Sequence, residues 1–161
     1  KSTKILKDLD YKINDSHIKT GLNNVSNNTG LQGRWQVIQR KPMIICDTAH
    51  NEAALGEVIS QLMDMEYSDL HFIIGFSNDK NLKKISKIFP EDSKYYFVQS
   101  KVGRARDAKE VRDIFKLNNR CGDYYKSIEN TIKYVKGVSK ENDIIFIGGS
   151  TFVVSEIFDK N

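Results

Sequence analysis

Three short polar clusters in this chain follow apolar runs and carry side chains that can bind anions or move protons. They are residues 47–51 (DTAHN), residues 75–80 (GFSNDK) and residues 148–151 (GGST). In the first cluster, the Asp47 carboxylate could accept two adjacent hydroxyl donors, such as those of a ribose, or could cap the next helix. One such cluster could be ordinary turn chemistry, whereas three at the same edge of a sheet favour a binding site.

The other polar side chains of these clusters have the same kind of alternatives. His50 could donate to a phosphate or a carboxylate, or be a capping or solvated residue. We expect no metal beside it, since no other Cys or His clusters with His50 and Asp47. Lys80 could meet an anion as a point charge or lie in solvent. Residues 148–151 offer free N–H groups and two hydroxyls, either as an anion seat or as a plain helix cap.

Alternating strands and helices must position these clusters. The predicted strands are 34–39, 42–46, 71–75, 95–98 and 143–147, and the predicted helices are 52–65, 82–89, 107–117, 128–138 and 152–158. This alternation predicts an α/β fold of Rossmann-like type, a mostly parallel sheet flanked by helices in three layers. Since ligands bind beyond the carboxyl ends of such strands, the three clusters should share one edge.

The first part of the chain differs from the rest. Apolar residues keep rough helical spacing through residues 1–28, and residues 23–30 are rich in Asn, Ser, Thr and Gly, as linkers are. No partner for such a helix is obvious within this segment. We therefore interpret it as the tail of a preceding domain, and the initial Lys in place of Met indicates a piece of a longer protein.

Composition excludes several classes of protein. A chain of 161 residues with 39% hydrophobic residues can bury one core. No apolar run reaches the length of a membrane-spanning helix, so we expect no membrane partner. The two cysteines, Cys46 and Cys121, form no disulfide framework, which favours the cytoplasm. The sequence holds neither a G-x-x-x-x-G-K-[ST] loop nor a G-x-G-x-x-G turn, so it has no P-loop of its own.

The net charge of +4 is local. Residues 101–112 hold five basic and two acidic side chains, whereas the proposed binding clusters lie elsewhere, except around Arg104. A solvated helix face is the preferred explanation, ahead of a small-anion site and of nucleic acid. We therefore expect no nucleic-acid partner.

The order of the motifs resembles that of a known family. Four motifs follow one another along the chain: Gly33-Arg34 before a strand, residues 47–51, Gly75 with Asp79-Lys80, and residues 148–150 before Phe152. Their order resembles that of the C-terminal domain of folylpolyglutamate synthase, a member of the Mur ligase superfamily that is often bifunctional with dihydrofolate synthase. The resemblance covers about residues 30–161. It implies that residues 30–161 are the C-terminal glutamate-ligase domain and that residues 1–29 are the terminal helix of an ATPase domain plus the linker.

The resemblance also implies a reaction. ATP phosphorylates a carboxylate of a pteroate or of the glutamate tail of a folate, and L-glutamate attacks the acyl phosphate to form an amide. The implied site residues are Arg34 and Asp47 for ATP, His50 as the catalytic residue, and Lys80, Ser150, Asp79 and Phe152 for glutamate. ATP and Mg²⁺ would be held mainly by the ATPase domain, and the enzyme is expected to be a cytoplasmic monomer.

Some positions depart from the family pattern, and other functions stay open. The family commonly has Gly at Thr48, Pro at Glu52 and Asp at Asn81, so the choice between folate and dihydropteroate is not fixed. One alternative is a non-catalytic Rossmann-like module that binds a nucleotide or an amino acid. Another is a domain of a different Mur-type amide ligase.

Overall fold

The computed structural model describes residues 2–158 and divides the chain into two compact units, one through Gln32 and one from Gly33 onward. The first unit contains α1 (Ser2–Asp8), α2 (Asp15–Asn23) and α3 (Val25–Thr29). The prediction of a single helix followed by a linker is therefore wrong in detail. The Asn14 side chain accepts the His17 N–H at 2.8 Å and starts a new helix, which separates α2 from α1.

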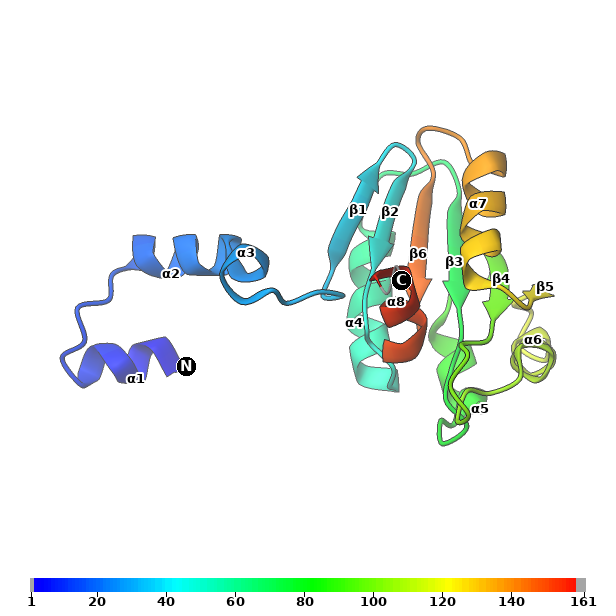
Figure 1. Ribbon diagram of the computed structural model, residues 1–161, viewed down its shortest axis with the longest axis horizontal. Coiled ribbons are helices and arrows are strands. Elements are labelled where there is room, and N and C mark those ends of the chain that lie inside the picture. Colours follow the sequence, from blue (N-terminus) through cyan, green and yellow to red (C-terminus); the bar gives the residue numbers. More distant parts are fainter. Residues whose placement is uncertain (1, 159–161) are drawn as a thin grey trace. The chain divides into compact units, whose positions relative to one another are not determined.

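The second unit is a sheet of six strands with helices on both faces (Figure 1). Its elements are β1 (Gln36–Arg40), β2 (Met43–Cys46), α4 (Glu52–Met63), β3 (Leu70–Ile74), α5 (Leu82–Ile85), the 3-10 helix η1 (Ser86–Ile88), β4 (Lys94–Val98), α6 (Ala108–Lys116), β5 (Gly122–Tyr125), α7 (Ile128–Val138), β6 (Ile144–Gly148) and α8 (Thr151–Phe158). The strand order is β1-β2-β6-β3-β4-β5, and only β1 runs antiparallel to its neighbour. The predicted α/β fold with a mostly parallel sheet is confirmed.

Two apolar cores lie on opposite faces of this sheet. On one face, α4, α5 and α6 pack through side chains such as Leu55 and Phe115 against Phe72. On the other, α7 and α8 pack through Val135 and Val153. Each fully buried side chain of this size stabilises the fold by about 1.5–3 kcal/mol, so both helix layers hold the sheet in place. Within residues 2–158, no helix is long and apolar enough to cross a membrane.

One strand escaped prediction. β5 occupies the edge of the sheet beside β4, and its residues are exposed or half-buried. A central parallel strand is buried on both faces and shows as a continuous apolar run, whereas Gly-Asp-Tyr-Tyr shows no such pattern.

The carboxyl ends of the three central strands meet closely. Cys46 pairs with Ile147, and Ile74 pairs with Gly148, so β2, β6 and β3 end at the same level. Gly75, just after β3, also lets the chain pass close to the end of β4, because a Cβ there would lie 2.3 Å from the Val98 carbonyl oxygen. The antiparallel β1 begins at this edge, which places the segment before it beside the loop after β2.

The opposite end of the sheet, where the parallel strands begin, carries a buried histidine. His71 is fully buried, and its Nε2 lies 3.2 Å from Asp143 Oδ2. Its Nδ1 lies 3.2 Å from the Tyr96 hydroxyl. Burial lowers the pKa of His71 below its ordinary value, and this effect outweighs the hydrogen bond to Asp143, which raises that pKa.

His71 should make stability depend on pH. Because its pKa is lower in the folded state, the unfolded chain takes up the proton first as the pH falls. Its contribution is complete above the unfolded pKa of about 6.5 and is lost as the pH falls below it. The free energy of unfolding should therefore fall by up to about 1.4 kcal/mol per pH unit below about pH 6.5. Urea unfolding of wild type and His71→Gln measures this slope.

The His71→Gln variant should lose that slope. The matched control is His17→Gln, since His17 is exposed in the first unit and the variant should keep it. Equal slopes in wild type and His71→Gln would contradict the assignment.

Candidate functional site

Asp47 joins two segments at the carboxyl edge of the sheet. Its carboxylate is 7% exposed and accepts two backbone N–H groups, that of Trp35 at 2.6 Å and that of Ala49 at 2.7 Å. It does not cap α4, because Asn51 takes that place by accepting the Ala54 N–H at 2.9 Å. Each carboxylate oxygen has a second lone pair, so the group can still accept from a ligand.

His50 lies at the start of the same helix with one ring nitrogen engaged. Its Nδ1 is 2.9 Å from the Thr48 carbonyl oxygen, which can only accept, so Nδ1 carries the proton in this arrangement. The Nε2 atom has no hydrogen-bond partner among residues 2–158. A neutral His50 therefore presents Nε2 as a proton acceptor at a half-buried position.

Arg34 reaches this edge through the turn before β1. The Thr48 N–H donates to the Gly33 carbonyl at 2.9 Å, and Gly33 has a φ of 70°. A Cβ at Gly33 would approach Thr48 Cγ2 to 2.9 Å, so only glycine fits the junction without a shift. The Arg34 side chain is exposed and forms no ion pair within the described residues. It is therefore a free cation next to the Asp47 loop.

The loop after β3 carries an ion pair. The Lys80 side chain is 24% exposed, and its ammonium group lies 2.9 Å from Asp79 Oδ2. This hydrogen bond, assisted by the positive charge of Arg104, holds the pKa of Asp79 below its ordinary value. Lys80 is thus not a simply solvated lysine, although its charge is shared with Asp79.

Ser150 and Phe152 complete the edge at the start of α8. Ser150 is 4% exposed, and its hydroxyl oxygen accepts the Phe152 N–H at 3.2 Å. This is the helix-cap geometry that the sequence left open, and it leaves the Ser150 O–H free to donate. The Arg104 guanidinium lies 4.6 Å from the centroid of the Phe152 ring, a cation–π contact.

Backbone hydrogen bonds tie these loops into one surface, which we call the rim. It comprises residues 33–35, 47–51, 75–80 and 148–152. The Asp47 N–H donates to the Ile147 carbonyl at 3.1 Å, and the Gly75 N–H donates to the Gly148 carbonyl at 3.2 Å. All the side chains predicted for the site therefore come from loops at the same edge.

Part of the basic segment also belongs to this edge, around Arg104 as the sequence allowed, whereas a solvated helix face was the preferred explanation of its charge. α6 begins only at Ala108, so Arg104 and Arg106 lie in the loop after β4 and not on a solvated helix face. The Asn78 N–H donates to the Arg104 carbonyl at 3.0 Å, and the Arg106 N–H donates to the Phe76 carbonyl at 2.8 Å.

Sequence analysis missed Arg106 as a site-forming residue. Its guanidinium donates to the Asn78 carbonyl and lies 3.5 Å from Glu110 Oε1, which connects the loop after β3 to α6. Its side chain is only 16% exposed, and Nε is buried without a partner among residues 2–158. The signal was the cluster of five basic residues in 101–112, but charge alone does not show which arginine turns inward.

A group of potential metal ligands lies elsewhere. Asp69, His71 and Asp143 have ligand atoms within 4.8 Å of one another at the amino ends of the strands. Asp143 already accepts the Lys140 N–H at 2.7 Å, and Asp69 pairs with the Lys94 ammonium at 2.9 Å. These contacts account for the cluster as a structural network, and it is remote from the rim.

Replacing Arg106 should loosen the loop after β3. Arg106→Met keeps much of the side-chain length and removes the guanidinium bond to Asn78, so the amides of Asn78 and Arg106 should exchange hydrogen at least about tenfold faster, about 1.4 kcal/mol of local opening. Amide exchange followed by NMR measures this. Arg112→Met is the matched control, since Arg112 pairs with Asp113 at the surface and the variant should leave both amides unchanged. Unchanged exchange in Arg106→Met would contradict the role.

Comparisons with known proteins identify relatives of this chain. The chain is 28% identical over 149 residues to a dihydrofolate synthase/folylpolyglutamate synthase of Buchnera aphidicola, covering 90% of this chain and 34% of the relative. It is 25% identical over 125 residues to a probable bifunctional folylpolyglutamate synthase/dihydropteroate synthase of Haloferax volcanii, covering 77% of this chain and 15% of the relative. The chain thus spans about a third or less of the length of these relatives.

Solved structures share the fold. A bifunctional folylpolyglutamate synthase/dihydrofolate synthase from Yersinia pestis superposes with a TM-score of 0.80 at 20% identity, over 97% of this chain and 36% of that one. A structure of such an enzyme with Mn, AMPPNP and L-glutamate bound gives 0.82 at 20% identity, over 97% and 37%. The model of the family described as Mur ligase, glutamate ligase domain, matches residues 33–151. This chain belongs to that family.

Proposed function

We propose that this chain is the glutamate-side domain of an ATP-dependent folate ligase. In the proposed reaction, ATP phosphorylates a carboxylate of dihydropteroate or of a folyl-glutamate. The amine of L-glutamate then attacks the acyl phosphate, and an amide, ADP and phosphate are formed. The observation that carries the proposal is the rim, which gathers an unpaired Arg34, a His50 with a free Nε2 and the Ser150 hydroxyl from separate loops.

On the ATP side, Arg34 and Asp47 have complementary chemistry. The Arg34 guanidinium is exposed and unpaired within the described residues, which suits the phosphates. Asp47 accepts two N–H groups and keeps lone pairs for the ribose hydroxyls. When bound, ATP with Mg²⁺ supplies the phosphoryl group. The sequence lacks a P-loop, so we propose that an N-terminal ATPase domain holds the metal and most of the triphosphate.

On the glutamate side, His50 is the proposed catalytic residue. Its Nδ1–H is held by the Thr48 carbonyl, so Nε2 can accept the proton that the glutamate amine loses during attack. Lys80 and the Ser150 O–H would hold glutamate carboxylates. Asp79 keeps the Lys80 ammonium in place, and Phe152 forms an apolar wall beneath Arg104.

The first unit supports the proposed partner. Apolar side chains in its helices and in the turn after α1, among them Ile5, Leu9 and Leu22, are more than half exposed. Apolar groups on short helices need a covering surface, which a preceding ATPase domain would supply. We propose that residues 1–29 are the end of that domain and its linker, and that the complete enzyme acts as a monomer in the cytoplasm, where the free Cys46 and Cys121 stay reduced.

The chain alone should hydrolyse no ATP. Its sequence has no loop to cradle the triphosphate, so phosphate release from ATP and Mg²⁺ should equal that of buffer. A malachite-green assay of the purified chain, with and without glutamate, measures this. ATP hydrolysis or ligase turnover by the pure chain would show that the catalytic machinery is not divided as proposed.

Removing the His50 imidazole should slow the complete ligase. In the enzyme formed by this chain and its ATPase domain, His50→Ala and Asp47→Ala should each lower kcat/KM for glutamate at least about tenfold, about 1.4 kcal/mol of transition-state stabilisation. His17→Ala removes an exposed imidazole in α2 and is the control, with kinetics as in wild type. Wild-type kinetics in both rim variants would refute their roles.

A further inference from the structure

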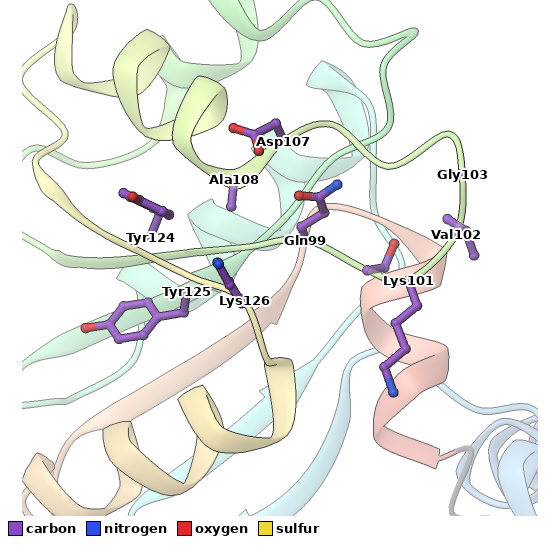
Figure 2. A pocket seen from close by; sticks show the side chains of 10 residues that line it. Gln99, Lys101, Val102, Gly103, Asp107, Ala108, Tyr124, Tyr125 and Lys126 are labelled. Carbon is purple, nitrogen blue, oxygen red and sulfur yellow. The ribbon is translucent and has the colours of Figure 1, made fainter.

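A pocket of about 470 Å³ lies beyond the carboxyl ends of β4 and β5 (Figure 2). Its wall is formed by the loop after β4, the first residue of α6 and the end of β5, with Gln99, Asp107 and Tyr124 among its lining side chains. The volume falls within the range of about 300–1,000 Å³ typical of small-molecule sites. No residue predicted for the rim lines this pocket.

Ser100 supplies an unused hydrogen-bonding group there. The residue is 5% exposed and lines the pocket, and its hydroxyl has no hydrogen-bond partner among residues 2–158. A hydroxyl without a protein partner is free to donate one hydrogen bond to a bound molecule and to accept others. The pocket therefore offers a donor that an occupant can satisfy.

The charges of the pocket favour a single negative charge. Lys126 and Lys101 form no ion pair within the described residues, and in Figure 2 the Lys126 ammonium is directed toward the space between β5 and α6. The one carboxylate of the lining, Asp107, is engaged as the cap of α6 and accepts the Glu110 N–H at 3.0 Å. A doubly charged phosphate would meet Asp107 unfavourably, whereas a carboxylate carries one charge and can accept from Ser100 and Lys126.

The pocket and the rim share a wall. The loop after β4 lines the pocket through Lys101–Gly103, and its next residue, Arg104, stacks on Phe152 and accepts the Asn78 N–H through its carbonyl. A ligand that places one carboxylate at the rim can therefore extend along this loop.

We propose that the pocket is a second carboxylate site, which takes a carboxylate of a glutamyl chain carried by the substrate. The proposal rests on the proposed ligase function, since that function supplies a ligand with several glutamyl carboxylates. It adds a site outside the rim, formed by Ser100 and Lys126, that holds a glutamyl residue other than the one being joined.

Titration of the full chain with a γ-linked triglutamate tests this directly. In ¹⁵N NMR spectra, the amides of Ser100 and Lys126 should shift and saturate at millimolar peptide. Ser100→Ala and Lys126→Gln should each weaken binding at least about fivefold, as expected for losing one hydrogen bond or one charge contact. Both variants should fold, because the Ser100 hydroxyl is unbonded and Lys126 is exposed. Lys136→Gln, in the last turn of α7, makes the same charge change and should bind as wild type does.

The competing outcomes separate cleanly. Absence of shifts at Ser100 and Lys126, or equal weakening by Lys136→Gln, overturns the site. Equal shifts with inorganic phosphate show a general anion site and overturn the assignment to a carboxylate. Failure of the ligase function appears elsewhere, as wild-type kinetics in the Asp47 and His50 variants, and is independent of whether triglutamate shifts the pocket amides.

Discussion

The buried carboxylate of Asp47 is the interaction on which the rim depends. Asp47 is 7% exposed, and a carboxylate is costly to bury unless its charge is met. Here each of its two oxygens accepts one backbone N–H group. One belongs to Trp35, before the antiparallel edge strand, and the other to Ala49, in the loop after the adjacent strand. By holding these two segments together, Asp47 positions the backbone from which the side chains of Arg34 and His50 extend.

On the other side of β6, the cationic side chain of Arg106 holds two segments together, as the Asp47 carboxylate does beside β2. Arg106 connects the loop after β3 to α6, and its own loop backbone bonds to Phe76 and Asn78. The buried Asp47 and the largely buried Arg106 thus hold the loops on either side of β6, while the exposed Arg34 and the half-buried Lys80 remain available for ligands. The same loop forms the wall of the pocket that contains Ser100.

Much of the fold was predictable because the central strands are buried on both faces. Ile144–Gly148 shows as a continuous apolar run, whereas Gly122–Tyr125 lies at an edge, half exposed, and escaped notice. The loops of the rim were predictable because parallel strands deliver their carboxyl ends to one side. The inward turn of Arg106 was not, since a side chain's direction in a loop depends on carbonyl groups contributed by distant residues. The sequence also did not show that Asn14 starts a new helix, because the helical spacing of apolar residues continues across it.

The strand order has a consequence for how the protein is made. β6 lies between β2 and β3 and contributes hydrogen bonds to both, yet it is synthesised after every other strand. While the ribosome translates residues 75–143, β2 and β3 both exist without their common neighbour, and their apolar faces stay uncovered. Contacts between residues this far apart in sequence form slowly, so the central strand sets the last step of assembly. Nascent chains halted before residue 144 should therefore lack residues 148–152 of the rim and keep the edges of β2 and β3 open to other pairings.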